Sequence, residues 1–255
     1  MRKTAVMTGL LLLAVTSMLA WSIDREGLAE ALNGAHRFTE NKARDDYRHP
    51  VETLEFFGIE PNMTVVESWP GGGWYTEVLA PYLKDNGKLI GAQPRARAAW
   101  DAMLDAHPEA YDKVVRVDLS EEAMAAPGTV DAVLDFRNAH NWIGNKERYD
   151  SLLTAWHTVL KPGGIVGIVD HRQDADSTVT GRTGYIKEQD LIDIMADYGF
   201  EFVAKSDVNA NAKDTKDHPG GVWTLPPVLR LGEENKAKYL AIGESDRLTM
   251  KFRKK

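Results

Sequence analysis

The chain has 255 residues, with 38 acidic and 31 basic side chains, a formal net charge of −7 and no cysteine. This length is enough for one α/β domain with a sizeable core. The lack of cysteine excludes disulfides, thiolate metal sites and cysteine nucleophiles. A negative charge without a basic stripe between the termini argues against nucleic acid as a partner.

Residues 1–22 have the pattern of a signal peptide. Residues 2–3 are basic, residues 5–20 are largely apolar, and Ala-Trp-Ser at 20–22 matches the small-x-small cleavage rule. The apolar run is short for a membrane span of about 20 residues, which favours cleavage over an uncleaved anchor. We therefore expect a periplasmic protein that starts near Ile23 and keeps no stable membrane anchor.

Residues 23–49 are expected to form an N-terminal segment ahead of the main domain. Leu28, Ala31 and Leu32 predict a short amphipathic helix near its start. The stretch from His36 to His49 is highly charged. It is interpreted as a solvated segment, with a lid over a cofactor as the alternative.

Residues 50–255 are predicted to form one domain in which strands alternate with helices. Strands are expected at residues 63–67, 88–92, 113–117, 131–136, 165–169, 200–205 and 248–252. Helices are expected at residues 50–57, 73–83, 94–106, 148–160 and 188–198. This alternation predicts a Rossmann-like α/β fold, with a seven-stranded, mostly parallel sheet and helices on both faces. The last strand is expected at the sheet edge, after a polar insertion at about 209–246.

A glycine turn follows the first predicted strand. The strand is rich in β-branched residues, and Gly71, Gly72 and Gly73 separate it from an apolar helix face that begins at Tyr75. Such a turn brings a ligand close to the backbone and to free N–H groups of the helix. The dinucleotide fingerprint needs a third glycine or alanine where this chain has Thr76, which disfavours a nicotinamide-dependent oxidoreductase.

The spacing from Glu67 to Gly71 and Gly73 resembles motif I of the class I S-adenosylmethionine (SAM)-dependent methyltransferases, with Trp69 in place of the first glycine. The Leu-Lys-Pro-Gly-Gly turn at 160–164 resembles the turn before their fifth strand. The runs WPGGGWYTE and RNxHNW resemble, more narrowly, predicted exported bacterial methyltransferases. The similarity covers roughly residues 50–205.

The resemblance implies that SAM is the cofactor and that it is bound at the carboxyl ends of the strands. The implied contacts are Glu67, Pro70, Gly71, Gly73, Gln93, Asp118 and Asn138. The glycines would approach the methionine part of SAM, Asp118 would lie near the adenine, and Asn138 near the methyl donor. Gln93 departs from the family, which usually has an acid at the ribose hydroxyls; glutamine offers one acceptor group and no charge.

Candidate catalytic residues lie after the fourth and fifth strands. His140 and His171 are candidate general bases, with hydrogen-bonded structural roles as the alternative. Asp135, Asp170 and His171 would be a possible divalent metal set. No metal is predicted, because Asp135 should lie inside its strand. Trp69, Trp74 and Trp142 would form an aromatic wall for the sulfonium or would simply pack in the core.

The sequence thus predicts SAM-dependent methyl transfer to a small-molecule acceptor in the periplasm. Such an enzyme needs no signature base, because SAM is already activated and alignment carries much of the catalysis. The alternative is a non-catalytic or repurposed ligand-binding protein on a methyltransferase fold, which Trp69 and Gln93 favour.

Overall fold

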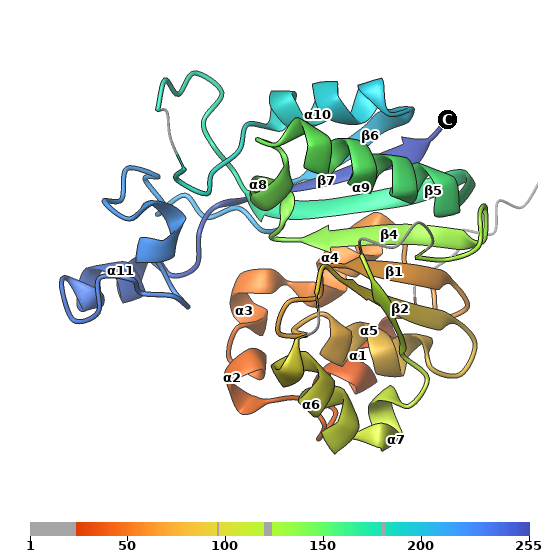
Figure 1. Cartoon of the computed structure of the whole chain (residues 1–255). Helices are drawn as coiled ribbons and strands as arrows, with labels where there is room; N and C mark the ends of the chain where they lie inside the picture. Colours follow the sequence, from red (N-terminus) through yellow and green to blue (C-terminus); the bar gives the residue numbers. More distant parts are fainter. Residues whose placement is uncertain (1–23, 96, 120–123, 180–181) are drawn as a thin grey trace, which may run out of the picture.

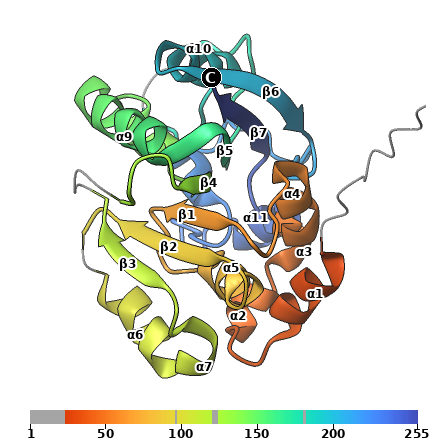
Figure 2. The ribbon, with the colours of Figure 1, turned by 90° about the vertical axis from the view of Figure 1, so that its right-hand side faces the viewer.

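A computed structural model describes residues 24–95, 97–119, 124–179 and 182–255. The predicted signal peptide, residues 1–22, lies outside these ranges. Within them the chain forms one seven-stranded sheet in the order β3-β2-β1-β4-β5-β7-β6 (Figure 2). The strands are β1 (Thr64–Ser68), β2 (Lys88–Gln93), β3 (Val115–Asp118), β4 (Val130–Phe136), β5 (Leu160–His171), β6 (Phe200–Ser206) and β7 (Arg247–Lys254). Six are parallel to one another and β7 is antiparallel, which confirms the predicted Rossmann-like fold.

The position of β7 differs from the prediction. It lies between β5 and β6 rather than at the sheet edge, with Ile168 opposite Met250 on one side and Phe202 opposite Phe252 on the other. The reason is burial: Met250 and Phe252 are fully buried, and a strand without solvent contact needs neighbours on both sides. β6 is largely exposed and takes the edge instead.

Helices cover both faces of the sheet, as the alternating pattern predicts. One face carries α1 (Arg25–Asn33), α4 (Pro50–Phe57), α5 (Thr76–Leu83), α6 (Ala98–Ala106) and α7 (Pro108–Tyr111). The other face carries α8 (Ala139–Trp142), α9 (Lys146–Val159) and α10 (Glu188–Asp197). Figure 1 shows α1, α5 and α6 on one side and α8, α9 and α10 on the other. Each group buries its own hydrophobic cluster against the sheet.

Several boundaries differ from those predicted. α5 begins at Thr76 rather than residue 73, because Gly71 and Gly73 adopt left-handed backbone angles. It continues past Pro81 to Leu83, although a proline is expected to end or kink a helix early. α6 begins at residue 98, not residue 94. β5 begins at residue 160 and includes the Pro-Gly-Gly turn, with a register shift against β4.

Two segments cover the carboxyl ends of the parallel strands. Residues 36–49 contain α2 (Thr39–Lys42) and α3 (Asp45–Arg48). The interpretation of this stretch as solvated holds in part: residues such as Thr39 and Asp46 are exposed, whereas Arg37 and Arg48 are only 4 % and 6 % exposed. The insertion contains a 3-10 helix, η1 (Gly221–Thr224), and α11 (Lys236–Ile242), and it lies beyond the same strand ends (Figure 1). In the described part of the chain, no helix is long and apolar enough to span a membrane.

Candidate functional site

The glycine turn after β1 has an unusual backbone. Gly71 and Gly73 have φ angles of 65° and 88°, and Trp69 has a φ of 57°. These angles lie in the left-handed region that residues other than glycine rarely adopt. A Cβ at Gly73 would lie 2.7 Å from Met103 Cε, so this glycine permits packing of the turn on α6. A Cβ at Gly71 would lie at an ordinary contact distance of 3.9 Å from Arg97 Nη1 and the Trp69 carbonyl, and one at Gly72 would meet nothing within 4 Å, so the turn has an open face at these two glycines.

Asn138 holds this turn in place. Its Nδ2 donates to the carbonyl of Trp69 at 3.0 Å and to the carbonyl of Phe136 at 3.0 Å. The backbone N–H of Trp69 donates to the carbonyl of Ala92 on β2 at 2.7 Å. The turn is therefore fixed by strands on both sides, and Asn138 acts as a positioning residue for the loop.

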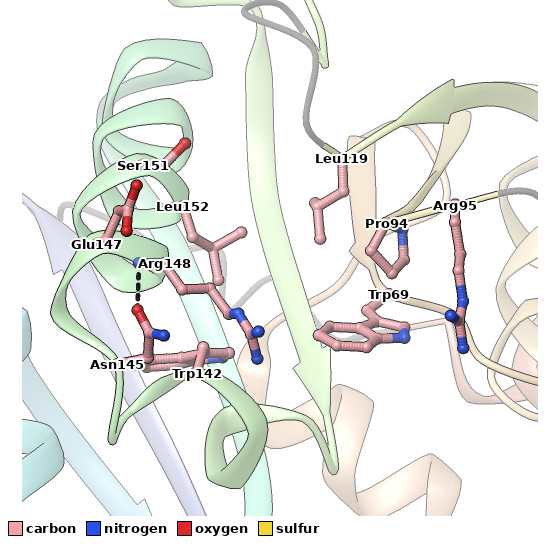
Figure 3. A pocket seen from close by; sticks show the side chains of 10 residues that line it. All are labelled: Trp69, Pro94, Arg95, Leu119, Trp142, Asn145, Glu147, Arg148, Ser151 and Leu152. Carbon is pink, nitrogen blue, oxygen red and sulfur yellow. Dashed lines mark hydrogen bonds between the residues drawn. The ribbon is translucent and has the colours of Figure 1, made fainter.

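A broad cavity opens beside the strand ends; we call it the outer cavity. Its volume is about 590 Å³, and its lining residues are Trp69, Pro94, Arg95, Leu119, Trp142, Asn145, Glu147, Arg148, Ser151 and Leu152. Figure 3 shows Trp69, Pro94 and Leu119 on one side, with the Arg148 side chain extending toward them from α9. Trp142 is fully buried and donates from Nε1 to Asp135 at 2.8 Å, so core packing accounts for most of its surface.

A second cavity of about 290 Å³, the inner cavity, lies above the glycine turn, between the 36–49 segment and the insertion. Its lining includes predicted site residues from several strand ends: Glu67, Pro70, Gly71, Asn138, His140 and His171. Arg44 and Arg48 reach it from the N-terminal segment, and Trp223 from the insertion. Trp69 lines both cavities, which places it at their junction.

Glu67 is buried at the floor of the inner cavity. Thr76 Oγ1 donates to its Oε2 at 2.5 Å, which ties the end of β1 to the start of α5. Burial raises the pKa of Glu67 to about 7, although the hydrogen bonds from Thr76 oppose that shift. Its position and this bond agree with a role in organising the loop.

Gln93 ends β2 and is bonded on one side only. Its Nε2 donates to the carbonyl of Gly71 at 3.1 Å, whereas its buried Oε1 has no partner among the described residues. Asp118 pairs with Gln93 across the sheet, and both line a third cavity of about 270 Å³, which shares Arg95 with the outer cavity. The unpartnered oxygen of Gln93 is a hydrogen-bond acceptor that no described residue uses.

The two histidines differ in their surroundings. His140 Nδ1 lies 2.9 Å from Asp170 Oδ1, and because a carboxylate only accepts, Nδ1 carries the hydrogen and Nε2 is left as a base. His171 Nδ1 lies 2.5 Å from Ser245 Oγ, and its Nε2 is buried without a partner among the described residues. Burial, followed by repulsion from Arg137, holds the pKa of His171 well below its usual value. His140 is therefore the stronger candidate base.

His140, Asp170 and His171 offer ligand atoms within 4.8 Å of one another, which is compact enough for a metal ion. The Asp170 oxygens already accept from the backbone N–H groups of His140 and His171, at 2.8 and 2.7 Å. Asp135 does not join the group, because it lies in β4 and bonds to Trp142. The three residues thus form a hydrogen-bonded unit by themselves.

A cluster of arginines, which the sequence alone does not reveal, lies beside the inner cavity. We call Arg44, Arg48, Arg137 and Arg247 the arginine cluster. Glu244 pairs with three of its members, and Arg48 also stacks on Trp74, 4.6 Å from its ring centre. Burial alone would raise the pKa of Glu244, but the guanidinium groups outweigh burial and lower it to about 2.

Solved structures with the same fold include several methyltransferases, all at low sequence identity. A SAM-dependent methyltransferase from Aquifex aeolicus is 17 % identical, covers 91 % of this chain and 98 % of its own, and has a TM-score of 0.57. A geranyl diphosphate C-methyltransferase from Streptomyces coelicolor is 15 % identical, covers 88 % and 87 %, and has a TM-score of 0.59.

The 4+2 cyclase SpnF also shares this architecture. It is 16 % identical, covers 87 % of this chain and 84 % of its own, and has a TM-score of 0.58. No protein-family model matches this chain, and no match was found among curated proteins. At these identities the similarity establishes the architecture alone. The chain has the Rossmann-like fold of the class I SAM-dependent methyltransferases.

Proposed function

We propose that the protein transfers a methyl group from SAM to a small-molecule acceptor bound in the inner cavity. The observation that carries this proposal is the open face of the glycine turn, which lies in the same cavity as the free Nε2 of His140. The methionine part of a cofactor over Gly71 and an acceptor beside His140 would be neighbours in this cavity. The methyltransferases of the same fold support this assignment.

The residues of the turn fit part of the cofactor. Gly71 leaves room for a close approach, and the unpartnered Oε1 of Gln93 accepts a hydroxyl hydrogen such as that of a ribose. Pro94 and Leu119 offer apolar walls for an adenine in the outer cavity. When bound, SAM supplies an activated methyl group, so the protein need only align the acceptor and remove its proton.

His140 is assigned the role of general base. Asp170 fixes its tautomer through Nδ1 and stabilises the positive charge that develops when Nε2 takes a proton. Trp223, with its ring 6.0 Å from that of His140, covers this part of the cavity. His171, being buried and held neutral, is assigned a positioning role through Ser245.

A second candidate function is ligand binding or a different reaction on the same fold. Trp69 occupies the position of the first glycine of the motif. The side-chain N–H of Gln93 donates to the carbonyl of Gly71 and is not available to a ligand. The cyclase with the same architecture is an example of another activity on this scaffold. For either function we propose the periplasm as the location, on the strength of the signal-like residues 1–22.

Calorimetry of the protein without residues 1–22 tests the cofactor. Titration with SAM, S-adenosylhomocysteine and NAD should give binding of the first two only.

Once an acceptor is known, His140→Asn should lower kcat by about 100-fold or more and leave S-adenosylhomocysteine affinity unchanged. His157→Asn, in the last turn of α9, is the control. Full turnover in His140→Asn would remove the base from the mechanism, and failure of both adenosyl ligands to bind would favour the second candidate.

A further inference from the structure

The positive charge of the arginine cluster exceeds the negative charge around it. Three of its members share the buried carboxylate of Glu244. Arg137 makes no ion pair within the described part of the chain, and Asp170 is the second carboxylate in its electrostatic surroundings. Four guanidinium groups thus face the carboxylates of Glu244 and Asp170 in a region of low solvent access, with Glu67, whose pKa burial raises to about 7, as a third acid at the floor of the cavity. Such an excess is costly unless a further anion is bound.

Hydrogen-bond donors of the cluster are also left over. The buried nitrogens without a hydrogen-bond acceptor among the described residues are Arg44 Nη2, Arg48 Nε, Arg137 Nε and Arg247 Nε, although Arg48 Nε lies 3.5 Å from its ion-pair partner Glu244 Oε2. Arg44, Arg48 and Arg137 line the inner cavity, and Arg48 is only 6 % exposed. Buried donors normally find partners, so several unmatched donors around one cavity indicate a missing acceptor of hydrogen bonds.

Electrostatics support the same conclusion. Burial and repulsion from Arg247 lower the pKa of Arg137 to about 10. Burial holds the pKa of Arg48 well below its usual value, with Glu244 opposing that shift and Arg137 adding to it. A bound anion would relieve both effects at once.

We propose that the inner cavity binds an acidic methyl acceptor, whose carboxylate or phosphate is held by Arg137 and Arg48. The inference rests on the proposed function, and the cofactor itself strengthens the case. The sulfonium and ammonium groups of SAM outweigh its single carboxylate, so SAM increases the positive excess rather than neutralising it. An acidic acceptor balances the charge and presents its reacting atom to the side of the cavity that holds His140.

Anion binding is measured without cofactor. The protein lacking residues 1–22 is titrated with inorganic phosphate and with benzoate, with chloride added to keep ionic strength constant, and binding is followed by calorimetry and thermal unfolding. At least one anion should raise the unfolding temperature, and preference for one of them distinguishes a phosphate from a carboxylate acceptor. Arg137→Gln should lower the affinity for that anion by about tenfold or more, because a charged hydrogen bond is lost. Arg253→Gln, which removes an exposed partner of Glu201, should bind like the wild type.

A second readout separates binding from structure. Without ligand, Arg137→Gln should unfold at the same or a higher temperature than the wild type, since a buried, repelled charge is removed; a structural arginine would show the opposite. Its affinity for S-adenosylhomocysteine should stay at the wild-type value. An equal loss of that affinity would mean that the cluster holds the carboxylate of SAM, and would overturn the inference.

The remaining outcomes distinguish this inference from the proposed function. If neither anion binds the wild type while S-adenosylhomocysteine does, the acidic acceptor is ruled out and the methyltransferase assignment stands. If an anion binds through Arg137 but S-adenosylhomocysteine does not, the anion site is supported and the cofactor assignment fails.

Discussion

Trp69 is a bulky residue in a backbone conformation that suits glycine. Left-handed angles at such a residue cost about 1–3 kcal/mol and persist where the surrounding structure enforces them. Here the enforcing contacts are the bonds from Asn138 and to Ala92. The indole is half-buried at the junction of the two cavities. The Trp69 side chain therefore determines how much space is open to a ligand that extends through both cavities.

Replacing Trp69 with glycine should join the two cavities. Backbone strain is relieved while indole packing is lost, so the free energy of unfolding should change by only about 1 kcal/mol. S-adenosylhomocysteine should bind more tightly, as measured by calorimetry. Trp69→Phe, which keeps a ring at the junction, is the control. Weaker binding in Trp69→Gly would show that the indole is a contact surface for the ligand rather than an obstacle.

Asp135 makes stability depend on pH. Burial, opposed by the hydrogen bond from Trp142, raises the pKa of its carboxyl from 3.8 to about 7. A raised pKa means that the folded state binds the proton more tightly, so this contribution to stability is complete below pH 4 and is lost as pH rises toward 7. Glu67, whose pKa is also raised to about 7, acts in the same direction.

Asp135→Asn keeps an acceptor for Trp142 and removes the charge. Its free energy of unfolding relative to the wild type should rise between pH 4 and pH 7, by up to about 4 kcal/mol, and then level off. Urea unfolding at several pH values measures this difference, in which the contribution of Glu67 cancels. A difference that stays constant with pH would show that Asp135 is already ionised in the folded protein. Asp150→Asn, in an exposed pair with Lys146, should show no such trend.

At the scale of elements, Asn209 connects the insertion to the domain. Its Nδ2 donates to Thr53 Oγ1 on α4 and to Thr249 Oγ1 on β7, each at 2.9 Å. Thr53 Oγ1 in turn donates to the carbonyl of Arg48 at 3.2 Å. One amide thus joins the start of the insertion, the last strand of the sheet and the N-terminal segment behind the inner cavity.

Asn209→Ala should therefore weaken two parts of the molecule. It leaves two buried hydroxyl oxygens without their donor and should lower the free energy of unfolding by about 1–3 kcal/mol. The insertion should also become more accessible to limited proteolysis, which a mass map of the fragments would show. Asn211→Ala, which also removes bonds from the insertion, is a comparison that leaves α4 untouched. Unchanged cleavage would mean that the insertion is held by its other contacts.

Elements were predicted well where the evidence is local. Runs of β-branched residues and helical apolar spacing specify β1, β4 and α9 within a few neighbouring residues, and the sequence places all three. The position of β7 depends on what covers it, so a short pattern does not separate an edge strand from an interior one. Burial by distant parts of the chain also explains why the sequence does not reveal the site residues in the 36–49 stretch, whose neighbours in the fold lie far along the chain.

For the whole molecule, the candidate site is an assembly of distant segments. The glycine turn and the two histidines follow from strand ends and were predicted from order alone. The arginine cluster is different, because its members come from α3 and the residue before it, the residue after β4 and the start of β7. From sequence alone, charged residues are expected at the surface, and only the folded arrangement shows that these arginines are gathered around one cavity.

The pairing of Arg44 with Glu244 spans 200 residues, and this separation has a consequence for folding. Contacts between distant residues form late, because the entropic cost of closing a long loop comes before the stabilisation that the contact provides. An intermediate with β1 to β5 paired would already have most of its secondary structure, yet its inner cavity would lack one wall. During refolding, the circular-dichroism signal should therefore recover before the ability to bind an anion, and the interval between them is the time that β7 needs to enter the sheet.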